Sequence, residues 1–368
     1  MDTQRFRDRL LSGRMSRREF NRGLTSVGIA MAMVPVGPRL ARADEQATYY
    51  TLGGLAEEGL FQRYIDKYGA MPDTAFWGDE EEALNKLRSG FEPDVTYCGS
   101  YSVARWREAD VIQPIDPGRL SNWPDLFERL RNVTDAVADG QQWLAPVGWG
   151  TTSVIYRSDL VEIDEESWSL LWDKRYEGRL AMIDGVADAV AGAAIYAGID
   201  PYTMGDAEIA KVKDVLTEQR SLLRLYTSDM TSLGQAIASG EIVAAMTWND
   251  VYASLLQQGV PVKYMFQPKE GISAFVSCMV LNKNSAQPDK AYEVMDSVLD
   301  PQSGAFWMTT YGYGHANQKA YDLVTDEQFA AIGLPKNSMA ILDNGVFQSR
   351  MQNEEKIVQM FEAVKAGI

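Results

Sequence analysis

The sequence is poor in the residues on which most metal sites and hydrolases depend. It contains one histidine, His315, and two cysteines, Cys98 and Cys278, in 368 residues. A single histidine argues against a His-based metal centre and a Ser-His-Asp hydrolase, because one imidazole would have to supply every role. No nucleophile elbow, phosphate-binding loop or metal-ligand cluster replaces it, and the segment 148–153 is not a Gly-x-Ser-x-Gly motif. We therefore predict no catalytic residue, no metal site and no cofactor.

Apolar runs that could cross a bilayer are also missing. The run Leu24–Val36 is too short, and too rich in Gly, Ser and Thr, to span about 30 Å of hydrocarbon. It follows a basic region that contains Arg17-Arg18 and precedes Ala41-Arg42-Ala43, which makes the three parts of a removable export signal. Paired arginines in that frame favour the twin-arginine pathway. We predict cleavage after Ala43 and a periplasmic chain.

Positive charge is scarce once that signal is removed. Residues 1–43 hold nine arginines and three acidic residues, so the formal net charge changes from −16 for the whole sequence to about −22 without them. Such a field repels nucleic acid and anionic membranes and generally favours cationic ligands. We expect a protein that binds no nucleic acid.

Internal repeats, low-complexity tracts and Pro-rich linkers are absent as well. Short apolar strands alternate with amphipathic helices, which indicates an α/β fold with partly parallel sheets. Ala47–Leu52 and Asp94–Tyr97 are typical strands, and Asp79 is placed to cap a helix that runs through Leu87. Residues 44–368 exceed the size at which single cores stop growing, so two lobes are expected.

The predicted strand ends carry a distinctive chemistry. In open α/β sheets, ligands bind beyond the carboxyl ends of the strands. The segments found there are Gly99-Ser100-Tyr101, Trp149-Gly150-Thr151, Asp184-Gly185 and Trp248-Asn249-Asp250. Aromatic rings, small residues and acids together are typical of a site for a small organic cation or zwitterion.

At this point the chain resembles periplasmic substrate-binding proteins of ABC importers, in the spermidine/putrescine class. Residues Ser167–Leu180 read SWSLLWDKRYEGRL, close to the family pattern SWxDLWxPxYKGxL. Further matches, in the family's order and spacing, are Pro93-Asp94-Val95, Trp149-Gly150, Met246–Asn249, Tyr311-Gly312-Tyr313 and Asn344–Gln348. The resemblance covers residues 44–368 almost completely.

The resemblance implies a type II periplasmic-binding-protein fold, with two α/β lobes and a ligand cleft between them. Residues 44–147 plus 274–368 would form lobe one and residues 148–273 lobe two, with crossings near 145–150 and 270–277. The protein would act as a monomer that captures a small amine by hinge closure and delivers it to an ABC permease in the inner membrane.

The family's binding-site residues map onto this chain with some acidic residues gained and others lost. The aromatic walls and polar contacts would be Tyr101, Trp149, Trp248, Phe275, Tyr313 and Gln348. Asp188 matches a family carboxylate that binds ammonium, Asp250 supplies a carboxylate where the family often has Gly, and Asp184 lies one residue from a lost acid. The two family acids that are lost fall on Gly185 and Ser277.

These losses bear on the ligand, because each buried ammonium group needs a carboxylate. They suggest fewer positive charges than spermidine carries, as in a monoamine, a γ-amino acid or a quaternary ammonium compound. Ser100, Thr151, Ser277 and the backbone amides around Gly53-Gly54 could then receive a hydroxyl or carboxylate end. Polyamine itself remains open, since Asp184 could replace the lost acid.

Two other functions stay open at this point. One is an exported enzyme on a similar scaffold. The other is ferric-ion binding, suggested by Tyr49-Tyr50, although neighbouring side chains on a strand point to opposite faces. The family also places the strands of Cys98 and Cys278 side by side, which leaves open whether the two thiols pair.

Overall fold

The computed structural model of the protein describes residues 46–368. The predicted export signal, residues 1–43, therefore lies outside the described residues. Within the described part, no helix combines the length and the apolar character needed to cross a membrane.

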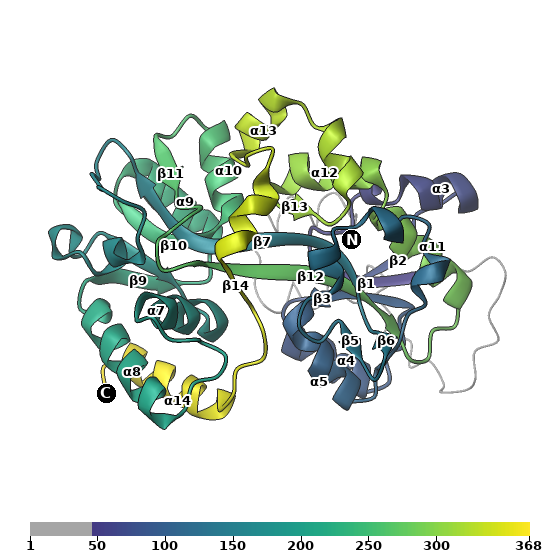
Figure 1. Cartoon of the computed structure of the whole chain (residues 1–368), viewed down its shortest axis with the longest axis horizontal. Coiled ribbons are helices and arrows are strands. Elements are labelled where there is room, and N and C mark those ends of the chain that lie inside the picture. The colour runs from purple at the N-terminus through teal and green to yellow at the C-terminus, as the bar shows by residue number, and fades with distance from the viewer. Residues whose placement is uncertain (1–45) are drawn as a thin grey trace, which may run out of the picture. The chain divides into compact units, whose positions relative to one another are not determined.

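The centre of the fold is one mixed sheet, in the order β2-β1-β3-β12-β7-β10-β8-β9 (Figure 1). Strands β2, β1 and β3 are parallel to one another, and so are β10, β8 and β9. The two parallel groups are joined by β7 and β12, which pair with each other and with their outer neighbours in the antiparallel sense. This arrangement confirms the predicted two-lobed α/β fold.

The first parallel group alternates strands and helices along the chain. Its elements are β1 (Thr48–Leu52), α3 (Gln62–Tyr68), β2 (Asp73–Trp77), α4 (Glu80–Arg88), β3 (Val95–Gly99), the 3₁₀ turn η2 (Ser100–Ser102) and α5 (Val103–Glu108). As predicted, the Asp79 carboxylate caps α4 by accepting the Glu82 amide at 2.8 Å. Short elements follow: β4 (Ile112–Gln113), α6 (Glu128–Arg131), β5 (Val137–Ala138) and β6 (Gln141–Gln142).

The second parallel group lies between the two long strands. The chain enters through β7 (Ala145–Arg157) and leaves through β12 (Ile272–Asn282). The elements between them are β8 (Leu180–Ile183), the π-helical turn η7 (Val186–Val190), α7 (Ala191–Tyr196), α8 (Asp206–Arg220), β9 (Leu223–Thr227), α9 (Met230–Ser239), β10 (Ala244–Trp248), α10 (Asn249–Gln257) and β11 (Val262–Tyr264).

After β12 the chain first packs near the N-terminal group and then returns. The remaining elements are α11 (Pro288–Val298), α12 (Pro301–Tyr311), β13 (Gly314–His315), α13 (Asp326–Ile332), β14 (Gly345–Phe347) and α14 (Glu354–Ala366). Helix α14 packs on α8, and Ile357, Phe361 and Val364 belong to the same apolar cluster as Val212 and Leu216. The predicted lobe one includes all of 274–368; α14 contacts α8 of the middle segment, and the division into lobes stays a prediction.

The two cysteines lie directly opposite each other on β3 and β12. Both are buried, their Sγ atoms are 3.7 Å apart, and they are free thiols in this structure. The predicted neighbourhood of these strands is thus confirmed, without a disulfide.

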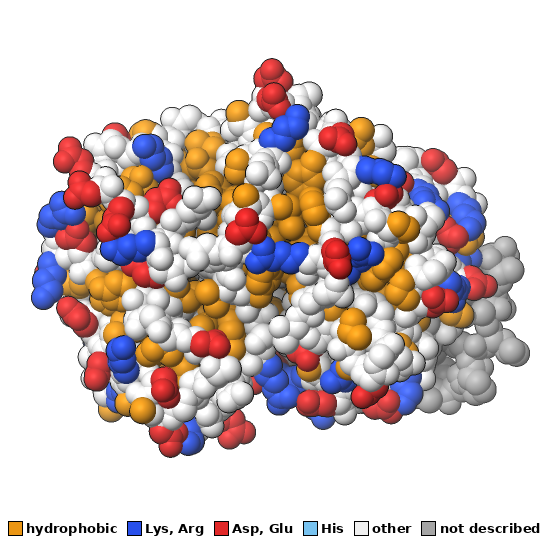
Figure 2. Space-filling model, viewed as in Figure 1, with side chains coloured by type: hydrophobic (Ala, Val, Ile, Leu, Met, Phe, Trp, Pro, Cys, Tyr) orange, Lys and Arg blue, Asp and Glu red, His pale blue; other side chains and the backbone are white. Residues whose placement is uncertain are grey.

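Charged side chains are dispersed on the face shown in Figure 2, where acidic and basic groups are interspersed. Many form exposed ion pairs, such as Arg119–Asp289 and Lys356–Asp206, both at 2.7 Å. Exposed pairs of this kind contribute little to stability, so this face is best read as a solvated surface.

Candidate ligand-binding site

A cavity of about 850 Å³ opens at the carboxyl ends of strands from both parallel groups. It is lined by residues that follow β1, β2 and β3 on one side and β8 and β10 on the other, with β7 and β12 between them. The location follows the rule that open α/β sheets bind ligands beyond their strand ends. The volume suits a small organic molecule.

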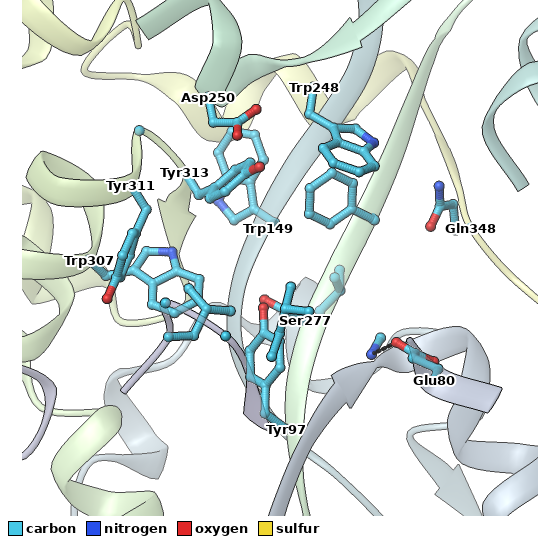
Figure 3. Close-up of a pocket in the computed structure, with 18 of the residues that line it drawn as sticks. Glu80, Tyr97, Trp149, Trp248, Asp250, Ser277, Trp307, Tyr311, Tyr313 and Gln348 are labelled. Atoms are coloured by element: carbon cyan, nitrogen blue, oxygen red, sulfur yellow. Dashed lines mark hydrogen bonds between the residues drawn. The ribbon is translucent and has the colours of Figure 1, made fainter. Parts of the chain in front are cut away.

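Most of the side chains predicted from the sequence meet in this cavity (Figure 3). The predicted residues that line it are Tyr101, Trp149, Asp188, Trp248, Asp250, Phe275, Ser277, Tyr313 and Gln348. The structure thus brings together residues that are up to 247 positions apart in the sequence, from Tyr101 to Gln348.

Two predicted residues lie elsewhere. Asp184 is more than a third exposed, and its carboxylate accepts a hydrogen bond from Lys365 of α14 at 2.6 Å, so it does not line the cavity. Ser100 is buried at the start of η2 and is likewise absent from the cavity wall. Asp184 therefore does not replace a lost acid, because its charge is neutralised at the surface.

Asp188 is the most deeply buried acid of the site, with 8% of its surface exposed. Its Oδ1 atom accepts two hydrogen bonds, from the Thr152 hydroxyl at 2.8 Å and from Trp248 Nε1 at 3.2 Å. Burial raises the pKa of this carboxyl above its usual value, and the two hydrogen bonds oppose that shift. No basic side chain pairs with it among residues 46–368.

Asp250 lies in the first turn of α10, directly after β10. It accepts the Val251 amide at 2.8 Å. Burial raises the pKa of Asp250 above its usual value. Asp188 and Asp250 are thus two carboxylates on either side of Trp248 in sequence, both without a basic partner in the described chain.

Glu80 is a cavity acid that the sequence did not single out. Glu80 lies with Glu81 and Glu82 in the first turn of α4, where acidic side chains interact favourably with the helix dipole. In the structure the Glu80 carboxylate also accepts the Gly99 amide at 2.7 Å and the Ser102 hydroxyl, and burial raises its pKa. Glu80 therefore holds the end of β3 and η2, the segment that presents Tyr101 to the cavity.

Aromatic rings form much of the remaining wall. Phe275 and Tyr313 meet edge to face with ring centroids 5.7 Å apart. Gly150 makes this approach possible, since an added Cβ would lie 2.3 Å from Phe275 and 2.7 Å from Tyr313. Trp149 also lines the wall but is only 1% exposed, and its Nε1 donates to the Tyr321 hydroxyl at 3.2 Å. Trp307, Tyr311, Tyr97 and Trp77 complete the aromatic wall and were not predicted.

The chemistry of the cavity is that of a cation site. No Lys, Arg or His of residues 46–368 lines it, and three buried or half-buried acids do. Aromatic faces add attraction for a cation of about 0.5–2 kcal/mol each. The described residues contain no cluster of three His, Cys, Asp or Glu side chains that could hold a metal ion.

The paired tyrosines suggested for ferric ion do not reach this cavity. Tyr49 and Tyr50 are fully buried, and their rings pack on Phe61 and Phe91 respectively. Their alternate orientation is the one expected of neighbouring residues on a strand. They are core residues of the first parallel group.

Comparison with known proteins agrees with this geometry. The chain is 26% identical over 284 residues to a putrescine/agmatine-binding protein of Pseudomonas aeruginosa, which covers 71% of this chain and 76% of that protein. It is 23% identical over 345 residues to the spermidine/putrescine-binding periplasmic protein of Escherichia coli K12, covering 92% and 97%.

A solved structure has a similar fold. The spermidine/putrescine ABC transporter substrate-binding protein of Streptococcus pneumoniae superposes with a TM-score of 0.76 at 16% identity, over 88% of this chain and 99% of that one. In addition, residues 50–333 match the model of the family described as bacterial extracellular solute-binding protein. That match covers well over half of the sequence, and the chain therefore belongs to the family of bacterial extracellular solute-binding proteins.

Proposed function

We propose that this protein is the periplasmic solute-binding component of an ABC importer, and that its ligand is a small organic amine. The observation that carries the proposal is the cavity itself: Asp188 and Asp250 are carboxylates with no basic partner in the described chain, set among aromatic rings. A buried unpaired anion is costly, and a bound ammonium group removes that cost. The polyamine-binding relatives support the same ligand class.

The two crossing strands supply the means of capture. The cavity is lined from both parallel groups, which are joined by β7 and β12. Bending of these strands would bring Tyr101 and Tyr97 of one side onto a ligand held by Asp188 and Trp248 of the other. The closed form would then be presented to a permease, with no chemical change in the ligand.

A thermal-shift screen tests the proposal directly. The chain without residues 1–43 would be melted with putrescine, spermidine, γ-aminobutyrate, choline, glycine betaine and taurine. A ligand at 100 times its Kd adds about 2.7 kcal/mol to the free energy of unfolding, and we expect at least one amine to raise Tm by a few degrees. If no amine in the panel raises Tm, and calorimetry detects no binding of any of them, the proposed ligand class is wrong.

We further propose that export uses the twin-arginine pathway, on the basis of Arg17-Arg18 and the apolar run that follows. Changing both residues to lysine should keep the charge yet leave the uncleaved precursor in the cytoplasm, as seen on an immunoblot of cell fractions. Accumulation of the double variant in the periplasm at the normal level would contradict this route. The variant with Arg5→Lys and Arg7→Lys, which also lie in the export signal, serves as the matched control and should be exported normally.

A further inference from the structure

Asn249 lies between two cavity residues, Trp248 and Asp250, but does not line the cavity itself. It is the first residue of α10, and only 2% of its surface is exposed. A buried asparagine amide must find hydrogen-bond partners inside the protein, because an unpaired polar group is costly there. Its partners are Thr151 and Gly312, which lie far apart in the sequence.

The first hydrogen bond joins α10 to the long strand β7. Trp248 is the last residue of β10 and pairs with Thr152. The next pair along these antiparallel strands would be Asn249 with Thr151, but the chain turns into α10 there. Asn249 Oδ1 instead accepts the Thr151 amide at 3.0 Å, in place of a strand carbonyl. Because the Thr152 hydroxyl donates to Asp188 Oδ1, consecutive residues of β7 hold the two acid-bearing segments of this parallel group.

The second hydrogen bond joins α10 to the turn after α12. Asn249 Nδ2 donates to the Gly312 carbonyl at 2.6 Å. Gly312 ends α12 with a left-handed backbone, φ 72°, and both its neighbours, Tyr311 and Tyr313, line the cavity. The turn approaches α10 closely, since a Cβ added at Gly312 would lie 2.9 Å from the Ala253 Cβ. Asn249 therefore sets how the tyrosines of this turn lie against the start of α10.

The two segments that Asn249 joins each supply a polar group to the cavity. In Figure 3, the Asp250 carboxylate and the Tyr313 hydroxyl point toward the same part of the cavity. Tyr313 also packs on Phe275, so a shift of its ring would move the aromatic wall as well. Binding groups must be held within about 0.5 Å of their productive positions. Loss of the Asn249 hydrogen bonds would release both groups from that placement.

We propose that Asn249 is a positioning residue of the binding site: it holds Asp250 and Tyr313 in their ligand-facing orientation without touching the ligand. Groups that the protein already holds in place lose little conformational entropy when an amine binds, which favours tight binding. This inference rests on the proposed function, since it concerns the binding of an amine at the same site.

Alanine substitution at two matched asparagines tests this role. Asn317 makes the same kind of link away from the cavity: it is fully buried, its Nδ2 donates to the Leu299 carbonyl at 2.8 Å, and its Oδ1 accepts the Lys319 amide at 2.9 Å. Isothermal titration calorimetry would use the six amines of the thermal-shift panel. We expect Asn249→Ala to weaken the binding of each amine that binds the wild type by at least tenfold. Asn317→Ala should keep each Kd within twofold, although both variants should melt at a lower temperature.

The outcomes separate this inference from the proposed function. A loss below tenfold in Asn249→Ala, or an equal loss in both variants, overturns the inference and leaves the proposed function intact. The failure of every amine to bind the wild type overturns both. Should Asn249→Ala fail to fold, hydrogen exchange of the wild type, measured by NMR, decides the question. The Thr151 amide should exchange at least 100-fold more slowly than in an unstructured chain, and free exchange of this amide overturns the inference.

A double-variant cycle separates positioning from a general loosening of the fold. If Asn249 acts by holding Asp250, prior removal of the Asp250 charge should remove much of what Asn249 contributes to binding. We therefore expect Asn249→Ala to weaken binding at most threefold in the Asp250→Asn protein. A loss of tenfold or more in that background, as in the wild type, contradicts the positioning role.

Discussion

Replacement of Asp188 by Asn is expected to weaken amine binding by roughly 100-fold and, at the same time, to raise the melting temperature of the ligand-free protein. Truncating one partner of a buried charge pair typically costs about 2–5 kcal/mol of binding free energy. An Asn side chain can still accept from Thr152 and Trp248 through its oxygen, so the hydrogen bonds that position Trp248 survive. Its NH₂ group, however, faces the ligand ammonium with a donor instead of an anion.

The stabilising effect follows from the sign of the pKa shift. Burial raises the pKa of Asp188 in the folded protein above its unfolded value. The folded state therefore binds the proton more tightly than the unfolded state does. Asp188 begins to lower the free energy of unfolding once the pH exceeds its unfolded pKa of about 4, and this effect is complete above its folded pKa. At neutral pH the Asn variant lacks that penalty. We expect its Tm without ligand to be higher by roughly 2 °C or more, measured by calorimetry.

Asp184→Asn provides a matched control, because it removes the same charge four positions away. Asp184 pairs with Lys365 outside the cavity, and exposed pairs contribute at most about 1 kcal/mol. The Asp184→Asn protein should bind amines within twofold of wild type, and its Tm should fall slightly. Loss of binding in the Asp184 variant, or unchanged binding in the Asp188 variant, would show that the cavity has been assigned to the wrong acids.

These two acids also show where sequence reasoning succeeds and where it stops. Asp184 and Asp188 both follow the predicted strand that became β8, and both are acids at a strand end. Which of them enters the cavity depends on the η7 turn and on Lys365, which lies 181 positions further along the chain. Nothing in the local pattern encodes that long-range ion pair.

Glu80 illustrates a different limit. Its role at the start of α4 was visible in the sequence, since an acid in a first turn is a local signal. Its hydrogen bonds to Gly99 and Ser102 depend on β2 and β3 both flanking β1, so that their carboxyl ends lie close together. The order of strands in a sheet is a tertiary property, and it cannot be read from local patterns in a single sequence.

The alternation of strands and helices, by contrast, was readable because each element obeys a local rule. The cap at Asp79 and the strands predicted at Ala47–Leu52 and Asp94–Tyr97 appear where the pattern places them, the strands as β1 and β3. Helix α14 shows the limit of such local rules. An amphipathic stripe shows that a helix packs on something, and it does not tell which lobe supplies the surface.

The largest expected effect on stability concerns the lone histidine. His315 is fully buried on β13: its Nε2 contacts the Val298 carbonyl at 3.2 Å, and its Nδ1 accepts the Asn317 amide at 3.1 Å. These partners suit a neutral ring with its proton on Nε2. Burial lowers the pKa of His315 from its ordinary 6.5 to about 4. The ring is therefore a structural contact, and protonating it in the folded state is unfavourable.

The pH dependence has a definite direction. A group whose pKa is lowered by folding contributes stability that is complete above its unfolded pKa, here 6.5, and that is lost as the pH falls toward the folded value of about 4. The loss attributable to His315 between pH 8 and pH 4 is roughly 3 kcal/mol of unfolding free energy. The buried acids Glu80, Asp188 and Asp250, whose pKa values are raised, act in the opposite direction over the acid range.

Comparison with His315→Gln separates these contributions, because the acids are common to both proteins. A Gln amide can still donate to the Val298 carbonyl and does not titrate. Denaturant unfolding of the wild type should therefore lose roughly 3 kcal/mol more than the variant between pH 8 and pH 4. If the variant does not fold, an NMR titration of untagged wild-type protein decides the matter, since its one imidazole should stay neutral down to pH 5. Parallel pH profiles, or an imidazole that titrates near 6.5 in the folded protein, would contradict this account of His315.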